Sequence, residues 1–184
     1  EPLTGRKITH ILYPLSQIEL SRIKNNFDLK NELHNYLVYG SYPEALIQKG
    51  NKAKIDILKE LINSYLLKDI IELEKVKGAK ILLDLLRLIA FQIGSEVSLN
   101  ELSRNLGMDV KTVARYLDLF EKSFILYNLR GYSRNLRTEV TKKSKYYFYD
   151  NGIRNAIISD FNDLEKRWRV YIPFNMADLM RYKE

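Results

Sequence analysis

The stretch SLNELSRNLGMDVKTVARYL, residues 98–117, constrains the fold most, because it has the spacing of two short helices joined by a tight turn. Ser98 followed by Glu101 forms a capping box at the start of the first helix. Gly107 lies where the turn needs a left-handed residue, and Asp109 can cap the second helix. Apolar residues recur at helical spacing on both sides of the turn: Leu99, Leu102, Leu106, Val110, Val113, Leu117 and Phe120. The stretch predicts a helix-turn-helix.

After this motif the pattern changes from helical spacing to aromatic and β-branched runs. The runs FILYNLRGYS (124–133) and KYYFYD (145–150) are typical of the two strands of a hairpin. Before the motif, apolar residues recur at helical spacing from Ile81 to Ile93, and Gly94 stands at a suitable position for a helix end. Three helices followed by a hairpin predict a winged helix within a mainly α chain.

The first third of the chain also has helical signals. Ser16 and Glu19 form a second capping box, and a short helix is predicted over residues 33–39. A longer run of apolar residues at helical spacing extends from Ile55 to Ile70. Only residues 8–12, which alternate between apolar and polar side chains, predict a strand in this region.

Positive charge is concentrated after the helix-turn-helix. The 184-residue chain has a net charge of +7, and the window from Lys122 to Lys145 contains seven basic residues and one acidic residue, Glu139. A basic cluster beside a helix-turn-helix is typical of a surface that binds phosphates. A solvated hairpin that keeps the protein soluble has the same composition, so both interpretations stay open on charge alone.

In a DNA-bound winged helix, the second helix of the motif enters the major groove. Its predicted outward residues are Lys111, Thr112 and Arg115, of which Arg115 suits a guanine edge and Lys111 a phosphate. Basic residues of the hairpin are candidates for the DNA backbone or a minor groove: Arg130, Arg134, Arg137, Lys142 and Lys143. Asp118 and Glu121 place negative charge on the same helix and oppose tight binding. Because winged helices also dock proteins, a docking module is the alternative function.

The sequence offers little for catalysis or metal binding. It has no cysteine, and His10 and His34 fall in different segments without a partner at metal-ligand spacing. It also lacks a GxxxxGK[ST] phosphate loop. We therefore predict no catalytic residue and no metal site in this chain. Its longest apolar run, ILLDLLRLIAFQI, contains two charges and is too short for a bilayer, and no signal peptide opens the chain, so we predict a cytoplasmic protein without membrane contact.

Five segments, in this order, resemble the C-terminal part of a prokaryotic family of AAA-type ATPases: LTGRKITHILYPLSQIEL, YGSYPEAL, SYLLKDIIELEKV, LNELSRNLGMDVKTVARYLDLFEKSFILYNLRGYSRNLR and KSKYYFYDNGIRNAI. The resemblance runs from Leu3 to about Ile158, and it is specific because the motifs recur in the right order and spacing. Proteins of that family have an N-terminal P-loop ATPase domain, a winged helix and then a region resembling restriction-endonuclease-like nucleases.

The resemblance implies a role for one N-terminal residue. The segment LTGR is similar to the family's segment after the sensor strand, which makes Arg6 a candidate nucleotide-sensing residue that acts on γ-phosphate charge. A surface arginine at a strand start is the alternative. ATP and Mg²⁺ are implied for the full-length protein, and no cofactor is expected for this chain. At the other end the sequence departs from the family, because Trp168 is followed by Arg169 and Val170 and no nuclease element can be found.

Taken with the resemblance, the sequence predicts a fragment of a longer protein, truncated at both ends. Residues 1–50 are expected to be the end of an AAA-type ATPase domain with small lid-like helices, 51–145 a winged-helix domain, and 146–184 a partial nuclease-like tail. The expected function is non-catalytic binding of duplex DNA, and the alternative is docking on its own ATPase domain or another protein. Whether the chain belongs to an enzyme stays open, as does its oligomeric state.

Overall fold

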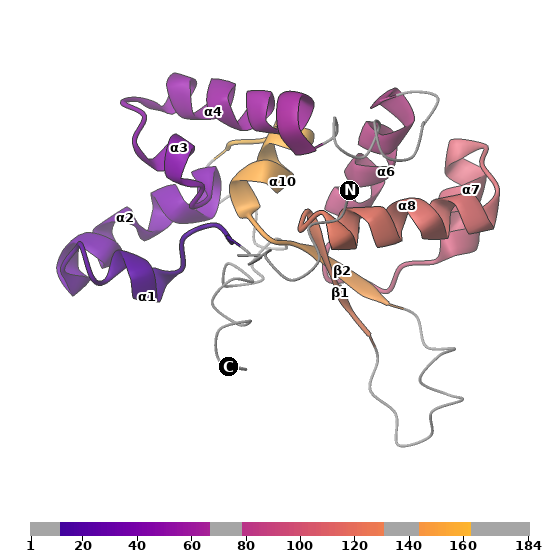
Figure 1. Cartoon of the computed structure of the whole chain (residues 1–184), viewed down its shortest axis with the longest axis horizontal. Helices are drawn as coiled ribbons and strands as arrows, with labels where there is room; N and C mark the ends of the chain where they lie inside the picture. Colours follow the sequence, from indigo (N-terminus) through magenta and orange to yellow (C-terminus); the bar gives the residue numbers. More distant parts are fainter. Residues whose placement is uncertain (1–11, 67–78, 131–143, 163–184) are drawn as a thin grey trace, which may run out of the picture.

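A computed structural model describes residues 12–66, 79–130 and 144–162, and this part of the chain is mainly helical, as predicted (Figure 1). No helix in these three ranges is long and apolar enough to cross a membrane. The elements, in chain order, are α1 (Gln17–Leu20), α2 (Asn26–Tyr39), α3 (Pro43–Leu46), α4 (Asn51–Glu60), the π-helix η1 (Leu61–Leu66), α6 (Ala79–Phe91), α7 (Leu99–Leu106), α8 (Val110–Lys122), β1 (Leu126–Leu129), β2 (Lys145–Phe148) and α10 (Asn151–Ile157).

The helices of the N-terminal part begin at polar caps. At α1, the Ser16 hydroxyl accepts the Glu19 N–H at 3.2 Å and the Glu19 carboxylate accepts the Ser16 N–H at 2.9 Å, which confirms the predicted capping box. At α2, the Asn25 side chain accepts the Asp28 N–H at 2.9 Å. The helix therefore starts at Asn26, well before the predicted 33–39. Its first turns are largely exposed and mostly polar, so the predicted helix began too late along the chain.

The predicted helix and hairpin around the helix-turn-helix are confirmed within the described residues. α6 buries Leu82, Leu85 and Leu86, three of the residues at helical spacing. β1 and β2 pair antiparallel in a register that sets Leu126 opposite Phe148. A third segment joins this pair just before α7: Glu96 forms an isolated antiparallel bridge with Lys145, and the Val97 N–H donates to the Ser144 carbonyl oxygen at 2.9 Å. The predicted strand at 8–12 lies almost wholly outside the described residues.

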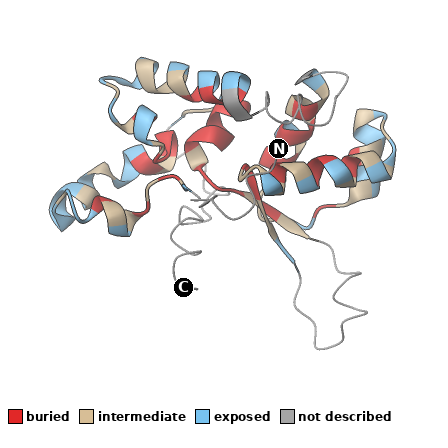
Figure 2. Ribbon diagram, in the orientation of Figure 1, coloured by how far each residue is buried: buried red, intermediate tan, exposed pale blue. Residues whose placement is uncertain are grey.

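α10 lies at the centre of the described structure (Figure 2). Every residue from Gly152 to Ile157 is buried, and the helix packs against α2, α4, α6 and β2. Its apolar residues Ile153, Ala156 and Ile157 belong to the same hydrophobic core as residues from α2, α6 and α8. α10 therefore connects the N-terminal helices to the helices and hairpin that follow.

Buried polar contacts fix α10 in this position. The Asp150 carboxylate accepts the Ile153 N–H at 3.0 Å, which caps α10, and the Ser41 N–H at 2.7 Å. The Asn155 side-chain amide donates to the Val38 carbonyl oxygen at 2.8 Å. These bonds tie α10 to the end of α2.

On the other side of α10, a buried arginine makes the matching contact with α6. The Arg154 guanidinium donates to the Ala90 carbonyl oxygen from Nε at 3.3 Å and from Nη2 at 3.1 Å, and its Nη1 donates to the Asn155 side chain at 3.1 Å. Because buried polar groups are costly unless they are hydrogen-bonded, these contacts hold α10 and α6 in one arrangement.

Candidate nucleic-acid interface

The turn between α7 and α8 depends on one glycine. Gly107 has φ +62° and ψ +35°, and no atom lies within 4 Å of where a Cβ would be, so the backbone conformation alone requires glycine here. The Ser103 hydroxyl closes the turn by donating to the Met108 carbonyl oxygen at 2.5 Å. The Met108 N–H donates back to the Ser103 carbonyl oxygen at 3.0 Å.

Side-chain caps set the start of both helices. The Ser98 hydroxyl accepts the Glu101 N–H at 3.4 Å at the start of α7. The Asp109 carboxylate accepts the Lys111 N–H at 3.0 Å at the start of α8. Both caps were predicted from the sequence, because a cap and its partner lie within three residues of each other. At Ser98 the structure confirms the half of the predicted capping box in which the serine side chain accepts the Glu101 N–H.

α8 buries one face and presents the other to solvent. The buried side chains are Val113, Tyr116, Leu117 and Phe120, of which Tyr116 was not predicted, whereas Val110 is only half-buried. Along the opposite face, Lys111, Arg115, Asp118 and Lys122 are exposed, and Thr112 is half-buried. The predicted residues of this helix thus lie together at its first two turns.

One of the acidic residues on α8 is paired within the helix. Lys122 and Asp118 form an ion pair at 2.7 Å, so the negative charge of Asp118 is matched by a neighbour one turn away. Glu121 is half-buried near the end of the helix. The Arg115 guanidinium lies 5.5 Å from the centroid of the Tyr116 ring, a cation–π distance. Lys111 and Arg115 are the basic side chains that are exposed on the first half of α8.

The hairpin lies against α8 and contributes one described basic candidate. α8 packs on β1, and Arg130 follows β1 directly and is exposed. At this end of the ladder Leu129 pairs with Lys145, so Arg130 stands one residue beyond the last pair. The other predicted hairpin residues, Arg134, Arg137, Lys142 and Lys143, belong to the connection between β1 and β2 and lie outside the described residues, as does Arg6.

A buried carboxylate is the most perturbed acidic group that the structure describes. Burial raises the pKa of Asp150 to about 6, although its backbone hydrogen bonds with Ser41, Ile153 and Gly152 oppose the shift. Burial, and then the nearby Asp150 charge, also raise the pKa of the Tyr42 phenol. Both groups lie at the joint between α2 and α10 and not on the α8 surface. Sequence patterns did not single out Asp150, since its main partner is remote along the chain.

Residues that could form a metal site do not gather in the described ranges, where no group of three or more His, Cys, Asp or Glu side chains has suitable geometry. The exposed basic side chains of α8, Lys111 and Arg115, are hydrogen-bond donors with a positive charge, and such groups can hold anions.

Residues 30–164 match a protein family described as "Domain of unknown function (DUF8612)". A protein of Haemophilus influenzae, described as uncharacterized, is 29% identical over 165 residues that cover 85% of this chain and 41% of that protein. An uncharacterized protein of Methanocaldococcus jannaschii is 22% identical over 174 residues that cover 85% of this chain and 38% of that protein. The chain thus spans about two fifths of the length of these relatives. No solved structure matches it.

Proposed function

The chain belongs to the family described as "Domain of unknown function (DUF8612)", and we propose that its α6–β2 region is a winged helix that binds duplex DNA. The order of elements supports the fold: α6, α7 and α8 are followed by the β1–β2 hairpin, and the segment between α6 and α7 adds the bridge from Glu96 to Lys145. Three helices with a small sheet of this connectivity are the arrangement that a winged helix requires.

One observation carries the DNA-binding part of the proposal: Lys111 and Arg115 are exposed at the start of the helix that follows the turn. In helix-turn-helix proteins, residues near the N-terminus of this second helix reach base edges, and lysines nearby contact phosphates. Arg115 suits a guanine and Lys111 a phosphate. The basic residues of the β1–β2 connection add further phosphate contacts on the proposed wing.

Docking of a protein on the same unit is the second candidate. Its expected signature is a large exposed apolar patch on α6 to β2. Among the described residues, large exposed apolar side chains of this unit are Phe91 and Leu129, whereas the others lie between residues 12 and 47. The distribution of exposed apolar surface favours DNA over protein as the ligand of the α6–β2 unit.

For the longer protein, we propose an AAA-type ATPase that uses its nucleotide state to reposition the winged helix on DNA. The resemblance of LTGR and YGSYPEAL to that family supports it, and the relatives are more than twice as long as the region matched here. No phosphate loop exists in this sequence, so its residues do not fit an ATP site, and no step of hydrolysis is assigned to them. Stimulation of ATP turnover by duplex DNA in a full-length relative tests this part.

Fluorescence anisotropy with a labelled DNA duplex at several salt concentrations tests the DNA proposal on the chain itself. The double variant Lys111→Glu/Arg115→Glu should weaken binding by more than about tenfold and lower the salt slope by about one per lost phosphate contact. The matched control is Lys49→Glu/Lys52→Glu, which changes the net charge equally at exposed positions beside and within α4.

The two double variants separate a specific surface from general attraction. If both weaken binding to the same extent, the DNA responds only to net charge and the α8 interface is wrong. Absence of duplex binding by the unmodified chain at low salt would also refute the proposal. A change confined to the α8 variant would place the DNA on this helix.

A further inference from the structure

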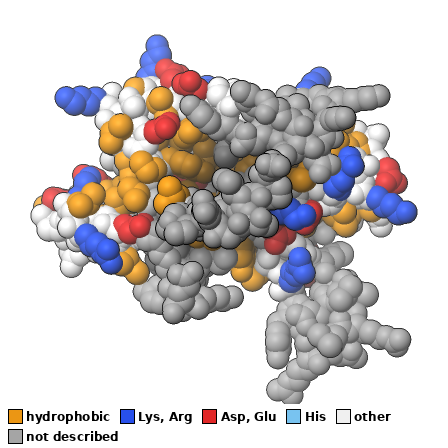
Figure 3. Space-filling view, viewed as in Figure 1, with side chains coloured by type: hydrophobic (Ala, Val, Ile, Leu, Met, Phe, Trp, Pro, Cys, Tyr) orange, Lys and Arg blue, Asp and Glu red, His pale blue; other side chains and the backbone are white. Residues whose placement is uncertain are grey.

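The N-terminal helices enclose a hollow that the DNA proposal does not use. It has a volume of ≈ 400 Å³ and is lined by residues of α1 to α4 and the segments between them. Leu20, Tyr36 and Ala45 form part of its wall, and Ile23 and Ile47 stand at its edge. Figure 3 shows hydrophobic side chains gathered over this half of the molecule. We call this feature the N-terminal groove.

Two apolar side chains at the edge of the groove are largely exposed to solvent. Ile23 and Ile47, which both line the groove, are 74% and 77% exposed. Single exposed apolar residues are ordinary, but two beside one apolar hollow favour a surface that binds another molecule. Because these two side chains are largely exposed, an occupant that covers them is larger than a ligand confined to the hollow.

A charged side chain gives the groove a preference for acidic ligands. Lys54 lines the groove from α4, where its ammonium group lies 5.3 Å from the centroid of the Tyr39 ring. The other charged groups of the lining are Lys24 and Glu32, which form an ion pair with each other. The Glu32 carboxylate also accepts the Tyr36 hydroxyl at 2.7 Å. Hydrogen bonds from Lys24 and Tyr36, and then the charges of Lys24 and Lys54, lower the pKa of Glu32. Two lysines and one carboxylate line the groove, so the lining keeps a net charge of +1.

We propose that the N-terminal groove binds an amphipathic helix of a protein partner, with apolar side chains in the hollow and an Asp or Glu beside Lys54. Apolar grooves on helical proteins take such helices through anchors on one face of the ligand. A carboxylate beside Lys54 supplies the charge complementarity, while Ile23 and Ile47 cover the apolar face.

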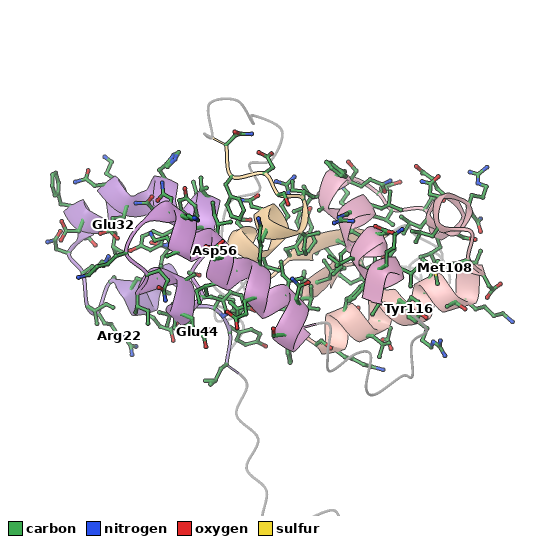
Figure 4. All side chains as sticks on the ribbon, turned by 90° about the horizontal axis from the view of Figure 1, so that it is seen from above. Arg22, Glu32, Glu44, Asp56, Met108 and Tyr116 are labelled. Carbon is green, nitrogen blue, oxygen red and sulfur yellow. The ribbon has the colours of Figure 1, made fainter. Side chains whose placement is uncertain are left out.

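This site is separate from the α8 surface. Seen from above, Arg22 and Glu32 lie at one end of the described structure and Met108, at the α7–α8 turn, lies near the other (Figure 4). A variant at one of these sites should therefore leave binding at the other unchanged. The chain would link a partner protein at one end to a nucleic acid at the other.

Selection from a phage-displayed library of random peptides about 15 residues long, the length at which isolated helices become marginally stable, tests the inference. The full 184-residue chain is the bait. Enriched peptides should carry apolar residues at helical spacing and at least one Asp or Glu. Their affinity, measured by anisotropy of labelled synthetic peptides, should fall by at least about tenfold with Ile47→Asp or Ile23→Asp. Both positions are exposed, so these variants should fold.

Two lysines of α4 provide the matched test of charge. Lys54→Gln should weaken peptide binding about two- to fivefold, as expected for a partly exposed ion pair. Lys52→Gln removes the same charge at an exposed position outside the groove lining and should leave affinity unchanged. The α8 variant Lys111→Glu/Arg115→Glu should also bind the peptides normally, which distinguishes this site from the DNA interface.

Other results would overturn the inference. Peptides that bind Ile47→Asp and Ile23→Asp as tightly as the unmodified chain do not occupy the groove, and enriched peptides without Asp or Glu refute the acidic preference. If the selection enriches no peptide, the groove does not bind amphipathic helices and the inference is wrong. If sedimentation shows a dimer of the unmodified chain that Ile47→Asp dissociates, a second copy occupies the groove instead. If the apolar dye anilinonaphthalene sulfonate binds in the groove while no peptide does, the occupant is a small molecule.

Discussion

Replacement of Gly152 by alanine tests how closely α10 packs on the end of α2. Gly152 lies in the first turn of α10 and its φ is not positive, so alanine can adopt its backbone conformation. Helix propensity alone then favours alanine by about 1 kcal/mol. A Cβ at this position, however, would lie 2.2 Å from the Tyr39 carbonyl oxygen and 2.9 Å from Asp150 Oδ1. Propensity and packing therefore predict opposite signs.

The packing effect should win. A backbone carbonyl cannot rotate away as a side chain can, so α10 must shift from Tyr39, and such overpacking costs about 1–3 kcal/mol. The shift also lengthens the hydrogen bond from the Ser41 N–H to Asp150, and a bond to a charged group contributes about 1.5–3 kcal/mol. After the gain in propensity, we expect the free energy of unfolding of Gly152→Ala to fall by about 2–4 kcal/mol.

Urea unfolding followed by far-ultraviolet circular dichroism measures this change, with Gly107→Ala as the control. Gly107 has open space around its Cβ position but a φ of +62°, so alanine there should lower the free energy of unfolding by only about 1–2 kcal/mol. If Gly152→Ala unfolds at the same or a higher urea concentration than the unmodified chain, the close packing of α10 on Tyr39 is wrong.

Three further predictions concern the same buried contacts and the first cap of the helix-turn-helix. Asp150 has a pKa of about 6 in the folded chain, whereas in the unfolded chain it loses its proton above about pH 4, so the free energy of unfolding should fall as the pH rises from about 4 to about 6. Urea midpoints of Asp150→Asn should depend less on pH over this range, and identical profiles for the two proteins would contradict this. Arg154→Lys cannot reproduce the two donors to Ala90 and should cost about 2 kcal/mol, or several degrees in thermal midpoint, whereas an unchanged midpoint would count against those bonds. Ser98→Ala removes the cap on the Glu101 N–H and should lower the free energy of unfolding by about 1 kcal/mol. An unchanged thermal midpoint would show that this cap does not stabilise α7.

Sequence patterns were most informative where cause and effect lie close together along the chain. The caps at Ser16 and Ser98, the turn at Gly107 and the two strands of the hairpin each follow from signals within a few residues, and the structure confirms them. The exposed charges on α8 follow from the same helical period that buries its opposite face. The prediction failed at the start of α2, where most side chains are polar and exposed and few apolar residues mark a buried face.

The basic residues from Arg134 to Lys143 and the nucleotide-sensing candidate Arg6 remain predictions, since they lie outside the described residues. The domain boundaries at residues 50 and 145 also remain predictions. The structure adds a physical link across both of them, because α10 packs against α2 and α6. A unit that binds DNA through α8 would therefore be held by the N-terminal helices through α10.

The sequence by itself determined the helix-turn-helix, the hairpin and the concentration of positive charge beside them. Only the tertiary structure decided where α10 lies, because Asp150 and Ser41 are 109 residues apart and Asn155 and Val38 are 117 apart. It also decided that apolar residues from α1, α2, α3 and the segments beside them surround one groove. Local patterns encode caps, turns and helix faces, whereas contacts between remote segments depend on how all the buried faces pack together.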